Sequence, residues 1–127
     1  MELKEILNKT FQSERIAITD IFNAGNIFGI VYRQRLIFKK NNVVILENKI
    51  ELGKSNSQRC ENLENENWSG KFTIDKEGKH VKCELINLKS ANTKTILADY
   101  ISDGILIGEV YNNGSNSGEG KIFEIIT

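Results

Sequence analysis

The sequence predicts an all-β fold: about eight antiparallel strands in an up-and-down barrel, with a short N-terminal helix over residues 1–9. Period-two alternation of apolar and polar residues recurs along residues 10–127, as in strands with one buried face. Short turns rich in Gly, Asn and Asp join most of these segments, which makes consecutive strands antiparallel neighbours. Gly29, Gly70 and Gly108 fall in mid-strand, where barrels bend. A β-sandwich is the alternative arrangement of the same strands.

Length and charge set the first limits on function. The 127 residues fit one domain with an apolar core, so we expect a single domain over residues 1–127. Seventeen basic and seventeen acidic residues give a formal net charge of zero, which argues against nucleic-acid and membrane partners. The N-terminus lacks a signal-peptide layout, and no run approaches the roughly 20 apolar residues of a spanning helix. We therefore expect a cytoplasmic protein, although a chain whose signal peptide had been removed would look the same.

The N-terminal segment begins with an amphipathic pattern. Leu3, Ile6 and Leu7 share one helical face, which predicts a short helix that must pack on the rest of the chain to be stable. Residues 10–22 are rich in β-forming residues, but their apolar alternation is broken. This break indicates a bend or a bulge.

Residues 27–38 and 43–52 predict two long strands of a hairpin. One face of each strand is apolar except for a single amide, Gln34 on the first strand and Asn48 on the second. A turn at residues 40–42 pairs these two amides with each other. The same register predicts the pairs Phe38–Val44, Leu36–Leu46, Tyr32–Ile50 and Ile30–Leu52.

A long loop and a second hairpin follow. Residues 53–65 are rich in turn-forming residues and predict a loop of a length that is often functional. Strands at 67–74 and 79–85 then flank a turn at 75–78. The alternation selects a register that pairs Phe72 with Val81, Gly70 with Cys83 and Trp68 with Leu85.

The last strands form a third hairpin and a closing strand. The turn Ser102-Asp103-Gly104 joins strands at 94–101 and 105–111, and the apolar match pairs Tyr100–Leu106, Ala98–Gly108 and Ile96–Val110. Residues 112–120 are rich in Asn, Gly and Ser and predict a flexible loop. Residues 121–127 predict the closing strand.

This meander, with its starting helix and the segment Trp68-Ser69-Gly70-Lys71-Phe72, resembles the small lipocalin-like barrels, the calycin folds that hold small ligands. The resemblance implies an up-and-down barrel with a ligand in its interior. Lipocalins usually carry a Gly/Trp signature on the first strand, whereas Trp68 lies on the fourth predicted strand here. No ligand-binding residues are therefore carried over from the group.

The sequence contains no recognisable catalytic or metal-binding motif, so we expect neither an enzyme nor a cofactor. Nucleophilic catalysis needs a base beside the nucleophile, and the single histidine, His80, falls on the solvent-facing side of its strand. A zinc site needs four ligands, and Cys60, His80 and Cys83 lack both number and spacing. Asp99 and Glu109, the acids nearest to a catalytic pair, fall on the less apolar face.

The interior amides are the strongest sign of a binding site. Buried amides are costly unless hydrogen-bonded, so Gln34 and Asn48 must bond to each other and to water, or contact a ligand. We expect a small apolar or amphipathic ligand in the interior of a non-enzymatic binding barrel. Its predicted contacts are Tyr32, Gln34, Asn48, Trp68 and Tyr100.

A protein–protein interaction module, such as an inhibitor or immunity-type protein, is the alternative function. It would act through the loops 53–65 and 112–120 or through a basic stripe at residues 33–40. Arg33, Arg35 and Arg59 are its predicted partner-binding residues, because arginine grips carboxylate or phosphate groups. Such charges equally keep an exposed strand soluble.

Overall fold

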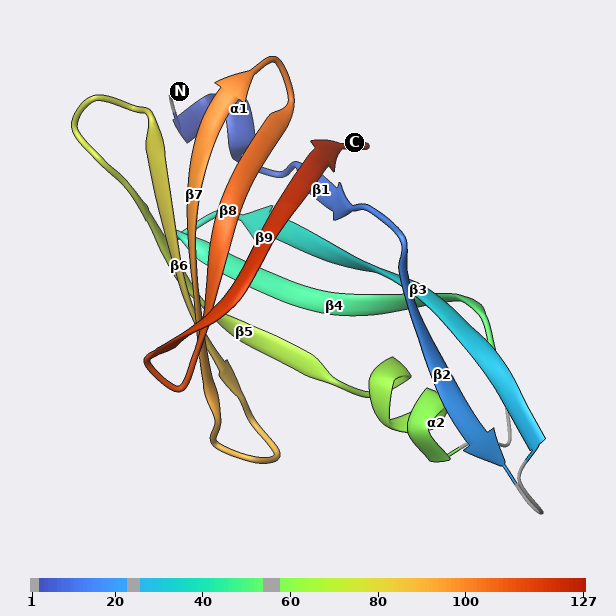
Figure 1. Cartoon of the computed structure of the whole chain (residues 1–127). Helices are drawn as coiled ribbons and strands as arrows, with labels where there is room; N and C mark the ends of the chain where they lie inside the picture. The colour runs from blue at the N-terminus through green and yellow to red at the C-terminus, as the bar shows by residue number, and fades with distance from the viewer. Residues whose placement is uncertain (1–2, 23–25, 54–57) are drawn as a thin grey trace.

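The computed structural model describes residues 3–22, 26–53 and 58–127 (Figure 1). Within these ranges, nine antiparallel strands form one sheet, and two short helices accompany it. The elements in chain order are α1 (Leu3–Ile6), β1 (Thr10–Ser13), β2 (Ile16–Phe22), β3 (Asn26–Lys39), β4 (Val43–Leu52), α2 (Gln58–Glu64), β5 (Asn67–Ile74), β6 (His80–Asn87), β7 (Thr93–Ser102), β8 (Ile105–Asn112) and β9 (Ser115–Ile125).

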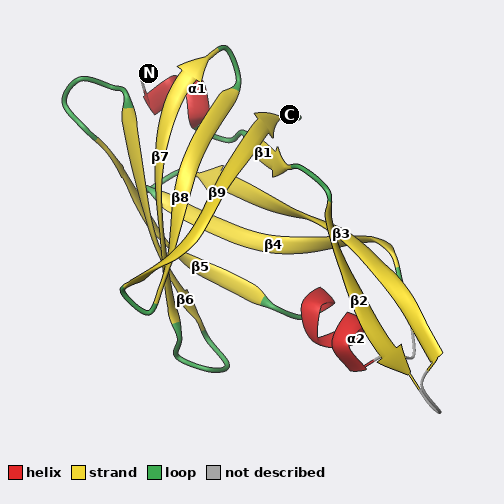
Figure 2. Cartoon of the chain, in the orientation of Figure 1, coloured by secondary structure: helices red, strands yellow, loops and turns green. Residues whose placement is uncertain are grey.

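Eight of these strands close into a barrel, which confirms the predicted architecture over the sandwich. Strands β3 to β9 pair in sequence order, and the short strand β1 pairs with β9 on one side and with β3 on the other. Strand β2 is the additional strand: it pairs with the first half of β3 beyond the point where β1 ends. The break in alternation at residues 10–22 is therefore the point where the chain leaves the barrel, between β1 and β2 (Figure 2).

The two ends of the barrel differ. Helix α1 and the β5–β6 and β7–β8 turns lie at one end, which we call the α1 end (Figure 1). Helix α2 and the β6–β7 and β8–β9 turns lie toward the other, which we call the α2 end. Helix α2 packs on β4 there.

One apolar core runs along the barrel interior, with a cluster of three phenylalanine rings toward the α1 end. Phe38 contacts Phe11 and Phe72 edge to face, with ring centroids 5.6 and 5.0 Å apart, a favourable geometry for aromatic pairs. Ile6, just before β1, is 0% exposed and belongs to the same core. The other members of this core are Leu36, Val44, Leu46, Trp68, Val81, Cys83, Leu85, Ile96, Ala98, Leu106, Val110 and Phe123.

The predicted register of the first hairpin is confirmed over most of its length. Gln34 pairs with Asn48, and Phe38–Val44, Leu36–Leu46 and Tyr32–Ile50 also pair as predicted. The last pair is wrong, because the ladder shifts between Val31 and Tyr32 and Leu52 then pairs with Val31. Such a shift bends a strand, and it lies where β3 passes from β1 to β2.

The predicted register of the second hairpin is wrong by two residues. Gly70 pairs with Leu85, Phe72 with Cys83 and Trp68 with Asn87. The turn is longer than predicted because the Asp75 carboxylate accepts hydrogen bonds from the backbone N–H groups of Lys79 and His80, at 2.9 and 3.1 Å. A shift of two residues keeps every side chain on its predicted face, since strands have a period of two.

Of the remaining fold predictions, the register of the third hairpin is confirmed and the two long loops are corrected. The pairs Tyr100–Leu106, Ala98–Gly108 and Ile96–Val110 are confirmed. The segment 53–65 is not a simple loop, because Gln58–Glu64 forms α2, and its residues 54–57 lie outside the described residues. The loop predicted at 112–120 is also wrong: β9 begins at Ser115, so the connection is a tight turn between Asn112 and Ser115.

Candidate functional site

The interior becomes polar toward the α2 end, and four of the five predicted ligand contacts lie together there. Gln34 and Asn48 are cross-strand partners, Tyr32 is two residues along β3, and Trp68 pairs with Leu46 on the next strand. Tyr100 lies at the α1 end, where it pairs with Leu106 and its hydroxyl accepts a hydrogen bond from the Gly104 N–H at 2.9 Å. The structure therefore separates Tyr100 from the other four.

Gln34 is held by its backbone and not by its side chain. Its N–H donates to the Oγ of buried Ser13 at 2.9 Å, while its side-chain amide has no hydrogen-bond partner within the described residues. Only 9% of Gln34 is exposed. In the described part of the chain, every fully buried side-chain nitrogen or oxygen has a hydrogen-bond partner. Because the Gln34 amide has none, it is not fully buried, and solvent reaches it.

Asn48 connects the barrel to α2. Its Nδ2 donates to the backbone carbonyl of Leu63 at 3.1 Å, so the hydrogen bond considered between the two paired amides is not formed. Sequence reasoning missed this contact because it treated the segment around Leu63 as a loop. Asn48 orients α2 at this end of the barrel and leaves Gln34 available to another partner.

Two charged residues that the sequence analysis did not single out complete this end. Trp68 Nε1 donates to Glu66 Oε1 at 2.8 Å, and Lys94 Nζ lies 4.8 Å from the centroid of the Trp68 ring, within cation–π range. Burial lowers the pKa of Lys94. Lys94 shares the parity of inward-facing Ile96 and Ala98, so the alternation of β7 contains the signal that identifies it.

Tyr32 lies in the same electrostatic environment. Burial raises the pKa of its phenol, and the carboxylates of Glu66 and Glu119 raise it further, while Arg59 opposes them. Tyr32 is half-buried. The α2 end thus places a phenol, an amide, an indole and an ammonium group on neighbouring strands.

The predicted partner-binding arginines are engaged within the molecule. Arg33 Nε donates to Glu51 Oε1 at 3.1 Å and Arg35 Nε to Gln12 Oε1 at 3.1 Å. An Arg59 guanidinium nitrogen donates to the Thr19 carbonyl at 3.2 Å. These contacts tie β1, β2 and β4 to their neighbours, so the stripe contributes to packing around the exit of β2.

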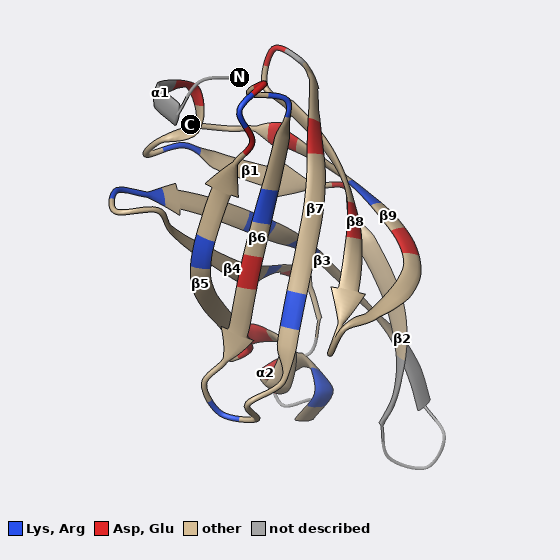
Figure 3. Cartoon of the chain, turned by 90° about the vertical axis from the view of Figure 1, so that its left-hand side faces the viewer, with Lys and Arg blue, Asp and Glu red and all other residues tan. Residues whose placement is uncertain are grey.

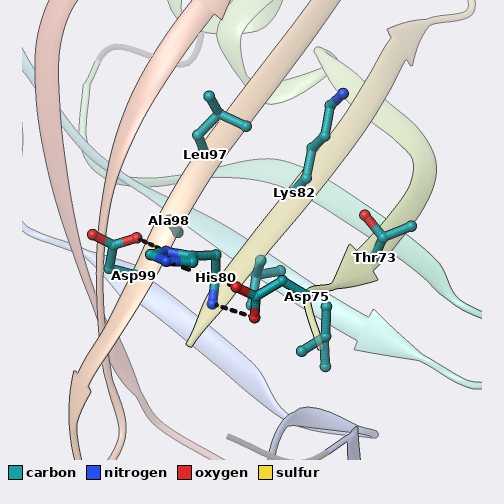
Figure 4. Close-up of a pocket in the computed structure, with 9 residues that line it drawn as sticks. Thr73, Asp75, His80, Lys82, Leu97, Ala98 and Asp99 are labelled. Atoms are coloured by element: carbon teal, nitrogen blue, oxygen red, sulfur yellow. Dashed lines mark hydrogen bonds and ion pairs between the residues drawn. The ribbon is translucent and has the colours of Figure 1, made fainter. Parts of the chain in front are cut away.

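A hollow lies on the outside of the barrel. It is an open groove of 460 Å³ across β5, β6 and β7 (Figure 4). His80 lies on its floor between two carboxylates: Nδ1 is 2.5 Å from Asp99 Oδ1, and Nε2 is 3.7 Å from Asp75 Oδ2. The hydrogen bond to Asp99 raises the pKa of His80. Sequence reasoning placed His80 correctly on the exposed face but missed Asp99, its cross-strand partner.

This outer groove does not assemble a nucleophile with its base. Within the described ranges, no hydroxyl or thiol hydrogen-bonds to the His80 ring. The Cys83 thiol points into the core, where burial raises its pKa to about 12. The arrangement holds the His80 ring between two carboxylates at the base of the β5–β6 turn.

Charge is mixed over the surface. Figure 3 shows basic and acidic residues interspersed on the face formed by β5, β6 and β7. In the part of the chain that the structure describes, three or more metal-ligating side chains do not converge at any point. Neither described helix has the length and apolarity required to cross a membrane. In comparisons with known proteins, the chain matches no family model, no curated protein and no solved structure.

Proposed function

We propose that this protein is a non-enzymatic binding barrel that takes a small amphipathic ligand into the α2 end of its interior. The observation that carries the proposal is the side-chain amide of Gln34. It lies inside the barrel, solvent reaches it, and none of the described residues hydrogen-bonds to it. A ligand that bonds to this amide would replace solvent with a fixed partner in a low-dielectric surrounding.

The contrast between the two ends supports this location. The α1 end is packed with aromatic rings, and we infer that α1 covers it, since Ile6 is fully buried. At the α2 end, the inward-facing side chains of Tyr32, Asn48 and Lys94 remain partly exposed. Access from solvent is therefore expected at the α2 end. A small set of polar groups beside aromatic surfaces is typical of small-molecule sites.

The architecture agrees with this function. An eight-stranded barrel is just wide enough to be filled by its own side chains or to hold one small ligand. Closed eight-stranded meanders are the framework of the calycin barrels, and kinship with that group is part of this proposal. The mixed interior, apolar at one end and polar at the other, suits a ligand with an apolar body and a polar head.

Fluorescence tests the proposal directly, because Trp68 is the only tryptophan in the chain. Titration with the neutral probe N-phenyl-1-naphthylamine should change Trp68 emission and increase probe emission along the same saturable curve. Gln34→Phe, which replaces the amide with a larger apolar ring, should abolish both changes. Lys49→Phe is the matched control, since Lys49 is exposed on the outside of β4.

An unchanged Trp68 signal in the folded wild-type protein would contradict the proposal. So would equal binding by Gln34→Phe and the wild type, which would place the probe on the outer surface.

A protein-interaction module is the second candidate, favoured by a groove of 450 Å³ on the outside of the barrel. Ile16, Ile107 and Ile122 line it, between the β1–β2 junction and the β8–β9 pair. A photo-crosslinking residue at position 122 should capture a protein partner in cells if this groove is its site. The same residue at position 49 is the control, and equal labelling from both positions would dismiss the groove.

A further inference from the structure

Lys94 is unusually placed for a lysine. It lies on β7, between Leu85 of β6 and Asn112 of β8, and its side chain faces the barrel interior. Its ammonium group lies over the Trp68 ring. None of the described carboxylates approaches its Nζ within the 4.0 Å of an ion pair. Taking an ammonium group out of water without a counter-ion is costly, and lysines are rarely buried unless paired.

The nearest acids do not supply that counter-ion. Glu66 accepts the Trp68 indole N–H, so one of its oxygens is already engaged. Glu119 lies closest to Lys121, at 3.8 Å, the outer limit of an ion pair. Both acids raise the pKa of Lys94 from a distance, without forming an ion pair, and the positive charge of Lys121 lowers it.

Lys121 adds a second positive charge to the same end. It shares the inward parity of Phe123 on β9, and only 18% of its side chain is exposed. The charge of Lys121 acts on Lys94, so the two ammonium groups of β7 and β9 lie within electrostatic range of each other. Lys94, which has no contacting carboxylate among the described residues, and Lys121 are the groups with which an anionic ligand would pair at this end.

We propose that the ligand of the α2 end is an organic anion, whose acidic group binds Lys94 and Lys121 while its apolar body lies against Trp68 and Tyr32. The chemical class is a carboxylate, sulfonate or phosphate monoester on an aromatic or aliphatic body. The inference rests on the proposed function and adds the charge of the ligand to it. Binding would provide Lys94 with a counter-ion, which the described residues do not supply.

Two probes that differ in one group test the charge. N-phenyl-1-naphthylamine is neutral, and 8-anilino-1-naphthalenesulfonate is the same body carrying a sulfonate. The wild-type protein should bind the sulfonate roughly tenfold more tightly than the neutral probe, as a charge-assisted contact implies. Lys94→Met should remove most of this difference by weakening the sulfonate alone. Lys121→Gln should weaken it by a smaller factor, and the exposed-lysine control Lys49→Met should leave both affinities unchanged.

The outcomes separate this inference from the proposed function. If both probes bind and Lys94→Met changes neither affinity, or both equally, the anion inference is overturned and the binding barrel stands. If neither probe changes Trp68 emission in the folded wild-type protein, both proposals fail. Circular dichroism of each variant establishes that it is folded, and Lys121→Gln decides the question if Lys94→Met does not fold.

Discussion

His80 is the residue whose charge depends most directly on its surroundings. Its cross-strand partner Asp99 accepts a short hydrogen bond from the ring, and Asp75 faces the other ring nitrogen. Both acids are exposed together with His80, so solvent weakens the attraction. The pair nevertheless holds β6 to β7 at the base of the β5–β6 turn, where Asp75 also accepts two backbone N–H groups.

This geometry predicts a pH-dependent contribution to stability. Asp99 raises the pKa of folded His80 above the unfolded value of about 6.5. The stabilisation is therefore complete below about pH 6.5 and is lost as the pH rises through the folded pKa. His80→Gln should lower the melting temperature at pH 5.5 and change it little at pH 9.

The control for this measurement is Lys82→Gln. Lys82 pairs with Glu84 on the outside of the same strand, so this substitution removes an ion pair that does not involve His80. An equal loss of melting temperature for His80→Gln at both pH values would show that the imidazolium charge does not contribute.

At the scale of single residues, the sequence correctly predicted whether a side chain faces the interior or the solvent. Alternation placed Gln34, Asn48 and Trp68 inside and His80 outside. It failed for Asp99 and Leu63, because a partner on another element depends on registers and turns that alternation does not determine. Lys94 was missed for a different reason: its inward parity was visible in the sequence, but a charged residue at a strand end was not considered for the interior.

At the scale of elements, Gly70 is where β5 and β6 approach most closely. A Cβ on Gly70 would lie 1.7 Å from the Glu84 carbonyl oxygen, a contact that only a backbone shift could relieve. Gly70→Ala should therefore destabilise the protein by about 3 kcal/mol, at the upper end of overpacking substitutions. The free energy of unfolding in urea measures this loss.

Gly29→Ala is the matched comparison within the same sheet. A Cβ on Gly29 would meet no atom within 4 Å, so alanine should be tolerated or should stabilise the protein by about 0.5 kcal/mol through the unfolded chain. Similar losses at both positions would contradict the close approach of β5 and β6. The three mid-strand glycines thus differ in the space around them: a Cβ would clash at Gly70, would meet tight contacts at Gly108 and would meet nothing within 4 Å at Gly29.

The hairpins show how much of a strand register the local apolar alternation determines. The β7–β8 register followed from its apolar match alone, whereas the β5–β6 register was wrong because the turn that Asp75 closes brings Ile74 opposite Val81, two residues later than predicted. Helix α2 was missed because its seven residues are too few to display a helical period, and it is held by packing on β4 and by the Asn48 contact.

At the scale of the whole molecule, closure depends on a strand of four residues. Only β1 joins β9 to β3, and the chain then leaves the barrel as β2. The sequence predicted a barrel from its successive hairpins, and the broken alternation at residues 10–22 marked the exit point. The difference between the two ends could not be predicted, because it requires knowing which strand ends lie together.

This difference between the ends is the basis of the functional account. Three phenylalanine rings pack together at the α1 end, whereas the α2 end contains Gln34, whose amide solvent reaches, and Lys94 over the Trp68 ring. The outer grooves are lined by none of Gln34, Trp68 and Lys94, so substitutions at these three residues separate ligand binding inside from partner binding outside.

The most direct test is a nitrogen–proton correlation NMR spectrum recorded during titration with N-phenyl-1-naphthylamine. The account predicts that the side-chain amide signal of Gln34 and the indole signal of Trp68 shift together and saturate, while the backbone signals of His80 and Leu97 in the outer groove stay in place. Saturable shifts confined to the outer groove, with Gln34 and Trp68 unmoved, would contradict a ligand site inside the barrel.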